Sequence, residues 1–389
     1  MNSRSIPYGR QTITEADIEA VVSVLKSDYL TQGPSIAIFE EKFAAYVGSK
    51  YAVALSNGTA ALHLCAMALN VNEKSRVITT PITFAASANC VRYCGGEVYF
   101  ADIDPNTFLL DIHKVRALLE KHPKGYFQGI IPVDFAGNTV DLEAFRKLAD
   151  EFGCWIIEDA CHAPGGYFID SKNKKQNCGN GNFADLAIFS FHPVKHIATG
   201  EGGMITTNDK ALYEKLLLLR THGITKDADK YKNSPDEVAQ GGWYYEMQEL
   251  GYNYRLTDFQ AALGISQLTR ADKNLERRRA LAKQYDAAFK NSKVITPLSF
   301  EGNAYHLYVI QVADRLGLYN HLRENNIFPQ VHYVPAHLMP YYKQFGNKKG
   351  DHPNAEAYYD KCLSIPMYHS LSDEDQKYVI DTILKFVSE

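Results

Sequence analysis

Residues 52–69, AVALSNGTAALHLCAMAL, decide the fold, because an apolar run passes through a small turn directly into a helical pattern. The run 52–56 predicts a buried strand, and residues 59–69 predict the helix that follows it. Six further β-rich runs come later, many of them separated by helical patterns: 76–80, 97–100, 129–133, 154–158, 186–191 and 203–207. Apolar strands joined by crossover helices favour an α/β fold with a mostly parallel, seven-stranded sheet covered on both faces.

Helical patterns also lie before and after this region. Thr14 stands before the apolar positions of a capped amphipathic helix, and a long helical segment extends from about Leu256 to Phe289. The polar stretch 225–245 that precedes the long segment is unusually extended for a loop in a compact domain. This length indicates a functional or a mobile segment.

The last third of the chain predicts a second, smaller α/β lobe. It contains a strand-like run and two helical patterns, at 305–312, 315–325 and 371–388. A chain of 389 residues is long for one ordinary domain. We therefore expect a large domain over residues 1–250 and a small C-terminal domain over residues 251–389.

Composition and charge exclude several classes of protein. With 46% hydrophobic and 22% charged residues the chain can bury a core, and its formal net charge of -4 gives no bulk attraction for nucleic acid or an anionic membrane. No apolar stretch approaches the roughly 18 residues that a membrane span needs, so we expect a cytoplasmic protein. The chain has seven cysteines, an odd number, and no C-x-x-C pair. Both facts argue against a disulfide framework and a zinc site.

Polar residues follow three of the predicted strands. Residues 56–60, SNGTA, open a helix with a small turn whose backbone N–H groups suit a phosphate, although such turns are common in α/β proteins. Asp159 directly follows the run CWIIE, where ligands gather, and a helix N-cap is the alternative role. Lys195 follows the run 186–191; a lysine among apolar groups can lose its proton and attack a carbonyl, whereas an ordinary surface lysine is the alternative.

Together these segments indicate a site for pyridoxal 5'-phosphate (PLP). Lys195 would bind the aldehyde and later move protons, and Asp159 would keep the pyridine nitrogen protonated so that the ring accepts electrons. Ser190 and Thr59, with nearby N–H groups, would bind the phosphate. Phe84 follows the run RVITT and is a candidate to stack on the ring, with a packed core aromatic as the alternative.

Five motifs in this order resemble the sugar-nucleotide aminotransferases of the DegT/DnrJ/EryC/StrS family: SNGTAAL, TPITFAASAN, EDACHAPGG, FSFHPVKHIATGEGG and GYNYRLTDFQAALG. The resemblance covers nearly the whole chain. It implies the fold-type I architecture of aspartate aminotransferase, PLP as cofactor, and a homodimer with the active site at the subunit boundary.

The resemblance also implies roles for individual residues. Lys195 is the Schiff-base lysine, Asp159 the partner of the pyridinium and Ser190 a phosphate ligand. His162 falls beside the phenolic oxygen of the cofactor, and Asn253 falls where the family sends an asparagine to the phosphate of the second subunit. The full cofactor-binding set is Gly58, Thr59, Ala60, Phe84, Asp159, His162, Ser190, Lys195 and Asn253. Family analogy places five further residues near the sugar nucleotide: Thr31, Gln32, Gly33, His332 and Tyr333.

Further motifs, among them IPYGRQTIT, LTQGP and PQVHYVPAHLMPYY, resemble the PseC-type enzymes of pseudaminic acid synthesis within this family. This resemblance implies transfer of an amino group from glutamate to the 4-keto carbon of a UDP-2-acetamido-2,6-dideoxy-hexos-4-ulose. The product would be UDP-4-amino-4,6-dideoxy-N-acetyl-β-L-altrosamine. Relatives that act on other 3- or 4-keto-6-deoxy nucleotide sugars, in perosamine-, bacillosamine- or legionaminic-type pathways, share most of the motifs and stay open as an alternative.

Other functions on the same scaffold are less favoured by the residues. Sugar 3-dehydratases of this kind carry histidine where this chain has Lys195, so the lysine argues against that activity. An intact lysine and aspartate also argue against a non-catalytic relative. A simple amino-acid aminotransferase stays open at this stage.

Overall fold

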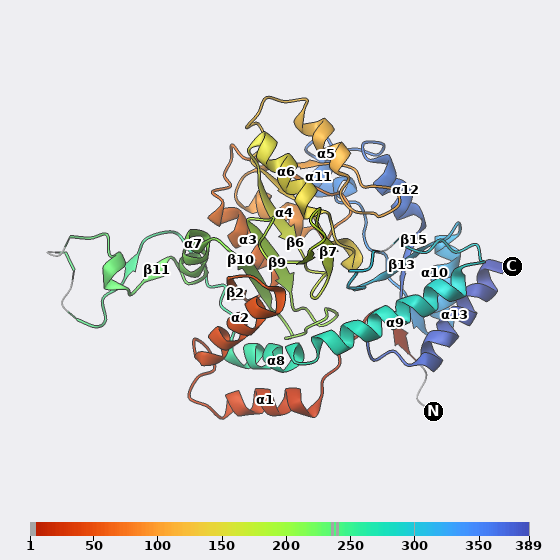
Figure 1. Cartoon of the computed structure of the whole chain (residues 1–389), viewed down its shortest axis with the longest axis horizontal. Helices are drawn as coiled ribbons and strands as arrows, with labels where there is room; N and C mark the ends of the chain where they lie inside the picture. The colour runs from red at the N-terminus through yellow and green to blue at the C-terminus, as the bar shows by residue number, and fades with distance from the viewer. Residues whose placement is uncertain (1–4, 235–236, 239–240, 299, 389) are drawn as a thin grey trace.

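A computed structural model describes residues 5–234, 237–238, 241–298 and 300–388 (Figure 1). At its centre lies a sheet of seven strands, in the order β2 (Tyr51–Leu55), β10 (Gly203–Thr207), β9 (Leu186–Ser190), β6 (Trp155–Asp159), β5 (Gly129–Ile131), β3 (Arg76–Thr79) and β4 (Glu97–Phe100). All pairings from β9 to β4 are parallel, whereas β10 is antiparallel to both of its neighbours. The prediction of a mostly parallel, seven-stranded sheet is therefore confirmed.

Helices cover both faces of this sheet. Because side chains alternate along a strand, Ile157 of β6 packs on the side of α3 (Gly58–Ala68), α4 (Ala86–Tyr93) and α7 (Lys210–Arg220). Its neighbour Ile156 packs on the opposite side, with α5 (Ile112–Leu119) and α6 (Leu142–Phe152). The same face continues over β2 and β10, where α2 (Pro34–Val47) closes the core. Burial on both faces explains why the strands are nearly continuous apolar runs.

The predicted long helix from Leu256 to Phe289 is in fact two helices, α8 (Asp258–Leu268) and α9 (Ala271–Phe289). Arg270 leaves the helical conformation, with φ -118° and ψ 10°, and its guanidinium reaches Asp17 of α1 (Glu15–Leu25). The prediction of one continuous helix is therefore wrong at this point, because a contact with a distant segment interrupts it. Figure 1 shows α1 lying beside α8, below the sheet.

The C-terminal lobe is built around β13 (Tyr308–Gln311) and β15 (Cys362–Ile365), which pair antiparallel. The helices α10 (Arg315–Glu324) and α13 (Asp373–Ser388) pack beside them. At the other end of the chain, β1 (Ile6–Pro7) pairs in parallel with β14 (Ile327–Phe328), so both termini lie at this lobe (Figure 1). We propose that the large domain ends at residue 250 and the small domain follows it.

The remaining elements are short. They are β7 (Tyr167–Ile169), β8 (Lys175–Asn177), β11 (Ile224–Thr225), β12 (Glu246–Met247), α11 (Pro340–Lys343), α12 (Pro353–Lys361) and three 3-10 turns, Phe135–Gly137, Ala228–Lys230 and Ala336–Leu338. The described residues of the stretch 225–245 form, with β11 and β12, an arm that extends from the body in Figure 1. Four of its residues, 235–236 and 239–240, lie outside the described residues. None of the described helices is both long and apolar enough to cross a membrane.

Asp17 is a buried residue of α1 that contacts α8 and Arg270, the residue before α9. Its carboxylate accepts hydrogen bonds from the Arg270 guanidinium, including one of 2.8 Å from Nη1 to Oδ1, and another of 2.7 Å from Ser266. Burial alone would raise its pKa, but the hydrogen bonds from Arg270 and Thr14 lower the pKa to about 2.

We expect Asp17→Ala to lower the free energy of unfolding at pH 7 by about 3 kcal/mol, because it leaves the Arg270 charge partly buried and unpaired. The folded-state pKa lies below the unfolded value of about 3.9, so this stabilisation is present above pH 4 and is lost as the pH falls towards 2. Urea unfolding at pH 7 and at pH 3 checks both points. Glu19→Ala, on the exposed face of the same helix, is the control. If Asp17→Ala lowered the free energy of unfolding at pH 7 no more than Glu19→Ala does, the role assigned to Asp17 would be contradicted.

Candidate active site

Three of the predicted site residues come together at the carboxyl ends of neighbouring strands. Asp159 is the last residue of β6 and Ser190 the last of β9, and these two strands are adjacent and parallel. The turn after β2 brings Gly58 to the same place: a Cβ atom built on Gly58 would lie 3.1 Å from Cβ of Ser190. Three segments that are far apart in sequence therefore border one space at this edge of the sheet.

Asp159 is only 5% exposed and is held in one orientation. Ser87 of α4 donates a hydrogen bond of 2.6 Å to Oδ2, and the backbone N–H of Cys161 donates one of 3.2 Å to Oδ1. Thr83 lies 2.7 Å from the Ser87 hydroxyl and completes the chain of hydrogen bonds. Within the described residues no lysine or arginine forms an ion pair with Asp159. A buried carboxylate with neutral donors alone is poised to receive a cationic partner.

The beginning of α3 offers free hydrogen-bond donors. Asn57 caps the helix and accepts the N–H of Ala60 at 2.8 Å. Among the hydrogen bonds of the described chain, none uses the N–H groups of Gly58 and Thr59. The positive end of α3 and the hydroxyl of Ser190 thus face the same space, which suits a phosphate. Ala60 belongs to the turn, but its own N–H is already bound.

Lys195 lies in the turn after β9, where its backbone N–H donates to the carbonyl of His192 at 2.8 Å. Its Nζ lies 3.5 Å from Nε2 of His306. Burial lowers the pKa of the Lys195 ammonium, and the nearby Cys161 and Asp159 only partly oppose this effect. A lysine with a lowered pKa has the free amine that attack on a carbonyl requires.

Two predicted residues, His162 and Tyr333, meet above the sheet edge although they come from different lobes. The Tyr333 hydroxyl lies 3.3 Å from Nε2 of His162, and Nδ1 of His162 accepts the N–H of Ala136 at 3.2 Å. Burial lowers the pKa of His162 well below its usual range, and the charge of Lys195 acts in the same direction, so the imidazole is neutral.

Other predicted residues lie at the edge of this cluster or away from it. His332 is buried against Ser364, with 2.8 Å between Nδ1 and Oγ, and burial lowers its pKa to about 3. Phe84 is 62% exposed, and its ring centre lies 6.3 Å from that of Tyr333. Asn253 is exposed, and it bridges to Thr221 beside the outer edge of β2.

Thr31, Gln32 and Gly33 form a turn that is also near this outer edge, where Thr31 bridges to Thr257. Asp258 accepts the N–H of Gly33 at 2.8 Å. A Cβ atom on Gly33 would lie 2.7 Å from the same carboxylate, so only glycine fits this turn without movement. No described contact joins the turn to Lys195.

A pair of buried carboxyl groups, Glu158 and Asp134, lies beside the site. Glu158 and Asp134 are buried within 4.8 Å of each other, and the N–H of Gly179 donates to Glu158 at 3.0 Å. Burial raises the pKa of Asp134 to about 7, and burial together with the charge of Asp134 raises the pKa of Glu158 well above its usual range. The raised pKa values favour a protonated carboxyl group in this buried pair.

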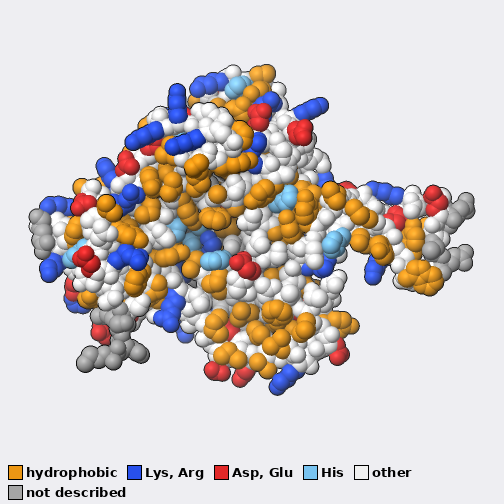
Figure 2. All heavy atoms as spheres, turned by 180° about the vertical axis from the view of Figure 1, so that it is seen from behind, with side chains coloured by type: hydrophobic (Ala, Val, Ile, Leu, Met, Phe, Trp, Pro, Cys, Tyr) orange, Lys and Arg blue, Asp and Glu red, His pale blue; other side chains and the backbone are white. Residues whose placement is uncertain are grey.

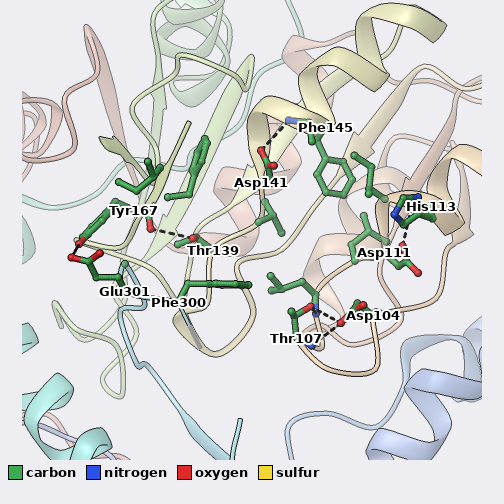
Figure 3. A pocket seen from close by; sticks show the side chains of 18 residues that line it. Asp104, Thr107, Asp111, His113, Thr139, Asp141, Phe145, Tyr167, Phe300 and Glu301 are labelled. Atoms are coloured by element: carbon green, nitrogen blue, oxygen red, sulfur yellow. Dashed lines mark hydrogen bonds between the residues drawn. The ribbon is translucent and has the colours of Figure 1, made fainter. Parts of the chain in front are cut away.

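A cavity of about 620 Å³ lies elsewhere, between the 104–113 loop, the start of α6 and residues 167–169 and 300–302 (Figure 3). None of the predicted site residues lines it. Four carboxylates line this cavity, those of Asp104, Asp111, Asp141 and Glu301. Among the described residues, no lysine or arginine lines it. An anionic substrate would be repelled there, so this cavity is not the candidate site.

Comparison with known proteins decides which chemistry this arrangement serves. The model of the DegT/DnrJ/EryC1/StrS aminotransferase family matches residues 11–384. The chain belongs to this family. This DegT-family aminotransferase is therefore a PLP-dependent sugar aminotransferase, as the motifs predicted.

Three relatives of this DegT-family aminotransferase illustrate the range of similarity. The spore coat polysaccharide biosynthesis protein SpsC of Bacillus subtilis is 39% identical over 98% of this chain and 97% of its own. The UDP-4-amino-4,6-dideoxy-N-acetyl-beta-L-altrosamine transaminase of Campylobacter jejuni is 38% identical over 99% and 98%. The PLP-form of the putative sugar aminotransferase Spr1654 from Streptococcus pneumoniae has a TM-score of 0.87 and 28% identity, with 99% of both chains covered.

The residues of this DegT-family aminotransferase fit PLP. The buried Asp159 lacks a cation, Lys195 has a lowered pKa, and the start of α3 with Ser190 forms a small cradle in which a side chain on Gly58 would be crowded. When bound, PLP carries the amino group between the two substrates and stabilises negative charge at the reacting carbon.

Sequence reasoning missed two residues of this site in the DegT-family aminotransferase, Ser87 and His306. Ser87 lies within the quoted motif TPITFAASAN, where only Phe84 was singled out, and His306 is the second residue of the strand-like run 305–312. Their contacts are formed across 72 and 111 residues of sequence, and no spacing pattern signals such contacts.

Because Ser87 donates to Asp159, Ser87→Ala of this DegT-family aminotransferase should lower kcat about tenfold, since a hydrogen bond to a charged group is worth about 1.5–3 kcal/mol. Steady-state kinetics with saturating substrates checks this value. Thr83→Ser, which keeps the hydroxyl that meets Ser87, is the matched control and should stay within about twofold of the parent. An unchanged kcat for Ser87→Ala would show that Asp159 does not depend on this contact.

Proposed function

We propose that this enzyme transfers the amino group of glutamate to the 4-keto carbon of a UDP-2-acetamido-2,6-dideoxy-hexos-4-ulose. The products would be UDP-4-amino-4,6-dideoxy-N-acetyl-β-L-altrosamine and 2-oxoglutarate. The observation that carries the proposal is the similarity to the C. jejuni transaminase, which extends over 99% of this chain. The SpsC relative is equally similar, so a different 3- or 4-keto-6-deoxy nucleotide sugar is the second candidate substrate.

We propose that Asp159 and Lys195 act on different parts of the cofactor. Asp159, oriented by Ser87, would accept the N–H of the pyridine ring and keep it protonated. Lys195 would hold the cofactor in the resting enzyme. During each half of the reaction its free amine would move a proton between Nζ and the reacting carbon, first from glutamate and then to the sugar.

We propose that the phosphate is bound by Ser190 and by the N–H groups of Gly58 and Thr59, with Ala60 shaping the turn. His162 would contact the phenolic oxygen, and Phe84 would cover the ring. Tyr333, which touches His162, would contact the sugar nucleotide together with His332. Glu158, whose pKa is raised, has no part in this scheme.

We further propose a homodimer. Asn253 and the turn of Thr31, Gln32 and Gly33 lie on the surface by the edge strand β2, and these positions suit residues that act in a second subunit. The helix α1 adds an exposed apolar stripe, Ile18, Val22 and Leu25, that supports a protein interface; Figure 2 shows apolar side chains gathered at the bottom of the molecule, where α1 lies. Asn253 of the partner subunit would then reach the phosphate.

Product analysis tests the proposed substrate. The enzyme is incubated with glutamate and a panel of UDP-linked 4-keto sugars, and the aminated carbon and its configuration are determined by NMR. The proposal predicts an amine at C4 with the L-altro configuration and one 2-oxoglutarate for each sugar aminated. Amination at C3, or preference for a ketosugar of another configuration, would favour the second candidate.

A further inference from the structure

His306 approaches Lys195 from the C-terminal lobe, and its backbone is firmly held. The N–H of Leu307 donates to the carbonyl of Ala136 at 3.1 Å, and the N–H of Ala304 donates to Gly137 at 2.8 Å. Arg278 of α9 donates to the His306 carbonyl at 3.3 Å. The segment is thus pinned to the turn that follows β5 in the large sheet, and the imidazole sits on a rigid support.

The imidazole of His306 is buried beside two other histidine rings. Its ring centre lies 4.4 Å from that of His162 and 5.7 Å from that of His196. Burial, and then the charge of Lys195, hold its pKa well below the usual range, so the ring is neutral and one nitrogen is free to accept a proton donor.

The neighbouring histidines His162 and His196 form hydrogen bonds to groups other than Lys195. His196 bonds the carbonyl of Ala304 at 2.8 Å, and His162 bonds Ala136 and Tyr333. Nδ1 of His306 has no hydrogen-bond partner among the described residues, and Nε2 faces Nζ of Lys195 at 3.5 Å. Within the same described residues, Nζ has no second hydrogen-bond partner. The hydrogen-bond contact of Nζ within the described residues is therefore the one with Nε2 of His306.

We propose that His306 is a positioning residue for Lys195: its imidazole accepts a hydrogen bond from Nζ and holds the amine in one direction whenever the lysine is released from the cofactor. The proposal rests on the role of Lys195 proposed above. A lysine amine on four methylene groups has many rotamers, and a displacement of about 1 Å at a reacting atom costs about 10²-fold in rate. His306 limits this freedom without carrying a charge itself.

The test compares His306→Phe, which keeps a planar ring but no acceptor, with His306→Gln, whose amide oxygen reaches towards the place of Nε2. His196→Gln is the matched control, because it keeps a donor for the Ala304 carbonyl and does not touch Nζ. The other titratable groups that face the pair stay as they are: Asp159, Cys161, His162, Arg278 and His332.

The first readout uses the full chain after removal of the cofactor. Competitive acetylation between about pH 6 and pH 11, with mass spectrometry of the peptide that contains Lys195, gives the pKa of this amine. His306→Phe should lower this pKa by about one unit, because the acceptor that stabilises the ammonium is lost. In the loaded enzyme kcat should fall about 10- to 100-fold, with the KM for the nucleotide sugar within about threefold of the parent. His306→Gln should recover most of both effects.

Two results would overturn the inference. An unchanged Lys195 pKa and kcat in His306→Phe would remove the contact from the mechanism. Equal losses in the Phe and Gln variants, with lowered thermal stability and an unchanged pKa, would leave His306 a packing role alone. Failure of the proposed function looks different, because Lys195→Ala would then retain turnover whatever His306 does.

Discussion

Lys195→Ala is expected to abolish transamination, with kcat lowered by at least about 10⁴-fold, because both the attachment of PLP and the movement of protons depend on one amine. The purified variant should also lose the yellow colour that PLP gives to the parent enzyme. Absorbance spectra and an assay for 2-oxoglutarate measure the two effects on the same sample.

Lys174→Ala is the control for this experiment, since it removes an exposed lysine in the turn between β7 and β8 and should keep both colour and rate. The low pKa that burial gives Lys195 distinguishes it from such surface lysines. Turnover in Lys195→Ala within about tenfold of the parent would contradict the assignment of this residue.

Asp159→Asn is expected to lower kcat about 10³-fold while the protein stays yellow. The amide oxygen can still accept the hydrogen bond from Ser87, so the local structure is kept. However, a neutral amide cannot hold the ring nitrogen in its protonated form, and the cofactor then stabilises negative charge poorly. Spectra of the bound cofactor, followed by single-turnover kinetics with glutamate, separate binding from chemistry.

Glu158→Gln is the matched control for Asp159→Asn, because it changes the carboxyl of the preceding residue on the same strand. Glu158 faces Gly179 and Asp134, and its raised pKa means that a neutral amide replaces a largely neutral acid. It should keep kcat within about threefold of the parent. Equal losses in the two variants would show that the strand, and not the charge at position 159, is what matters.

The strands could be predicted from sequence because each is a short apolar run with polar residues at its end. The runs 97–100 and 203–207 coincide with β4 and β10 to the residue. The direction of β10 could not be predicted, since five buried residues have the same pattern whether they run parallel or antiparallel to their neighbours. The break at Arg270 could not be predicted either, because Asp17, the partner of its guanidinium, lies far away in sequence.

The same distinction applies to the site. Asp159 and Ser190 could be predicted because they end two apolar strands, and parallel strands end at a common edge. Ser87 and His306 could not, because a hydroxyl on a helix and a histidine before a strand acquire their roles only when the fold places them against Asp159 and Lys195.

We propose that Lys195 is the residue that holds PLP, with Asp159 on the opposite side of the cofactor. Reduction of the loaded enzyme with borohydride fixes the cofactor permanently to the amine that holds it, and mass spectrometry of the digested protein then locates it. The account predicts the added pyridoxyl phosphate on the peptide that contains Lys195, and on no other lysine. Attachment to a different lysine, or a loaded enzyme that yields no labelled peptide, would contradict it.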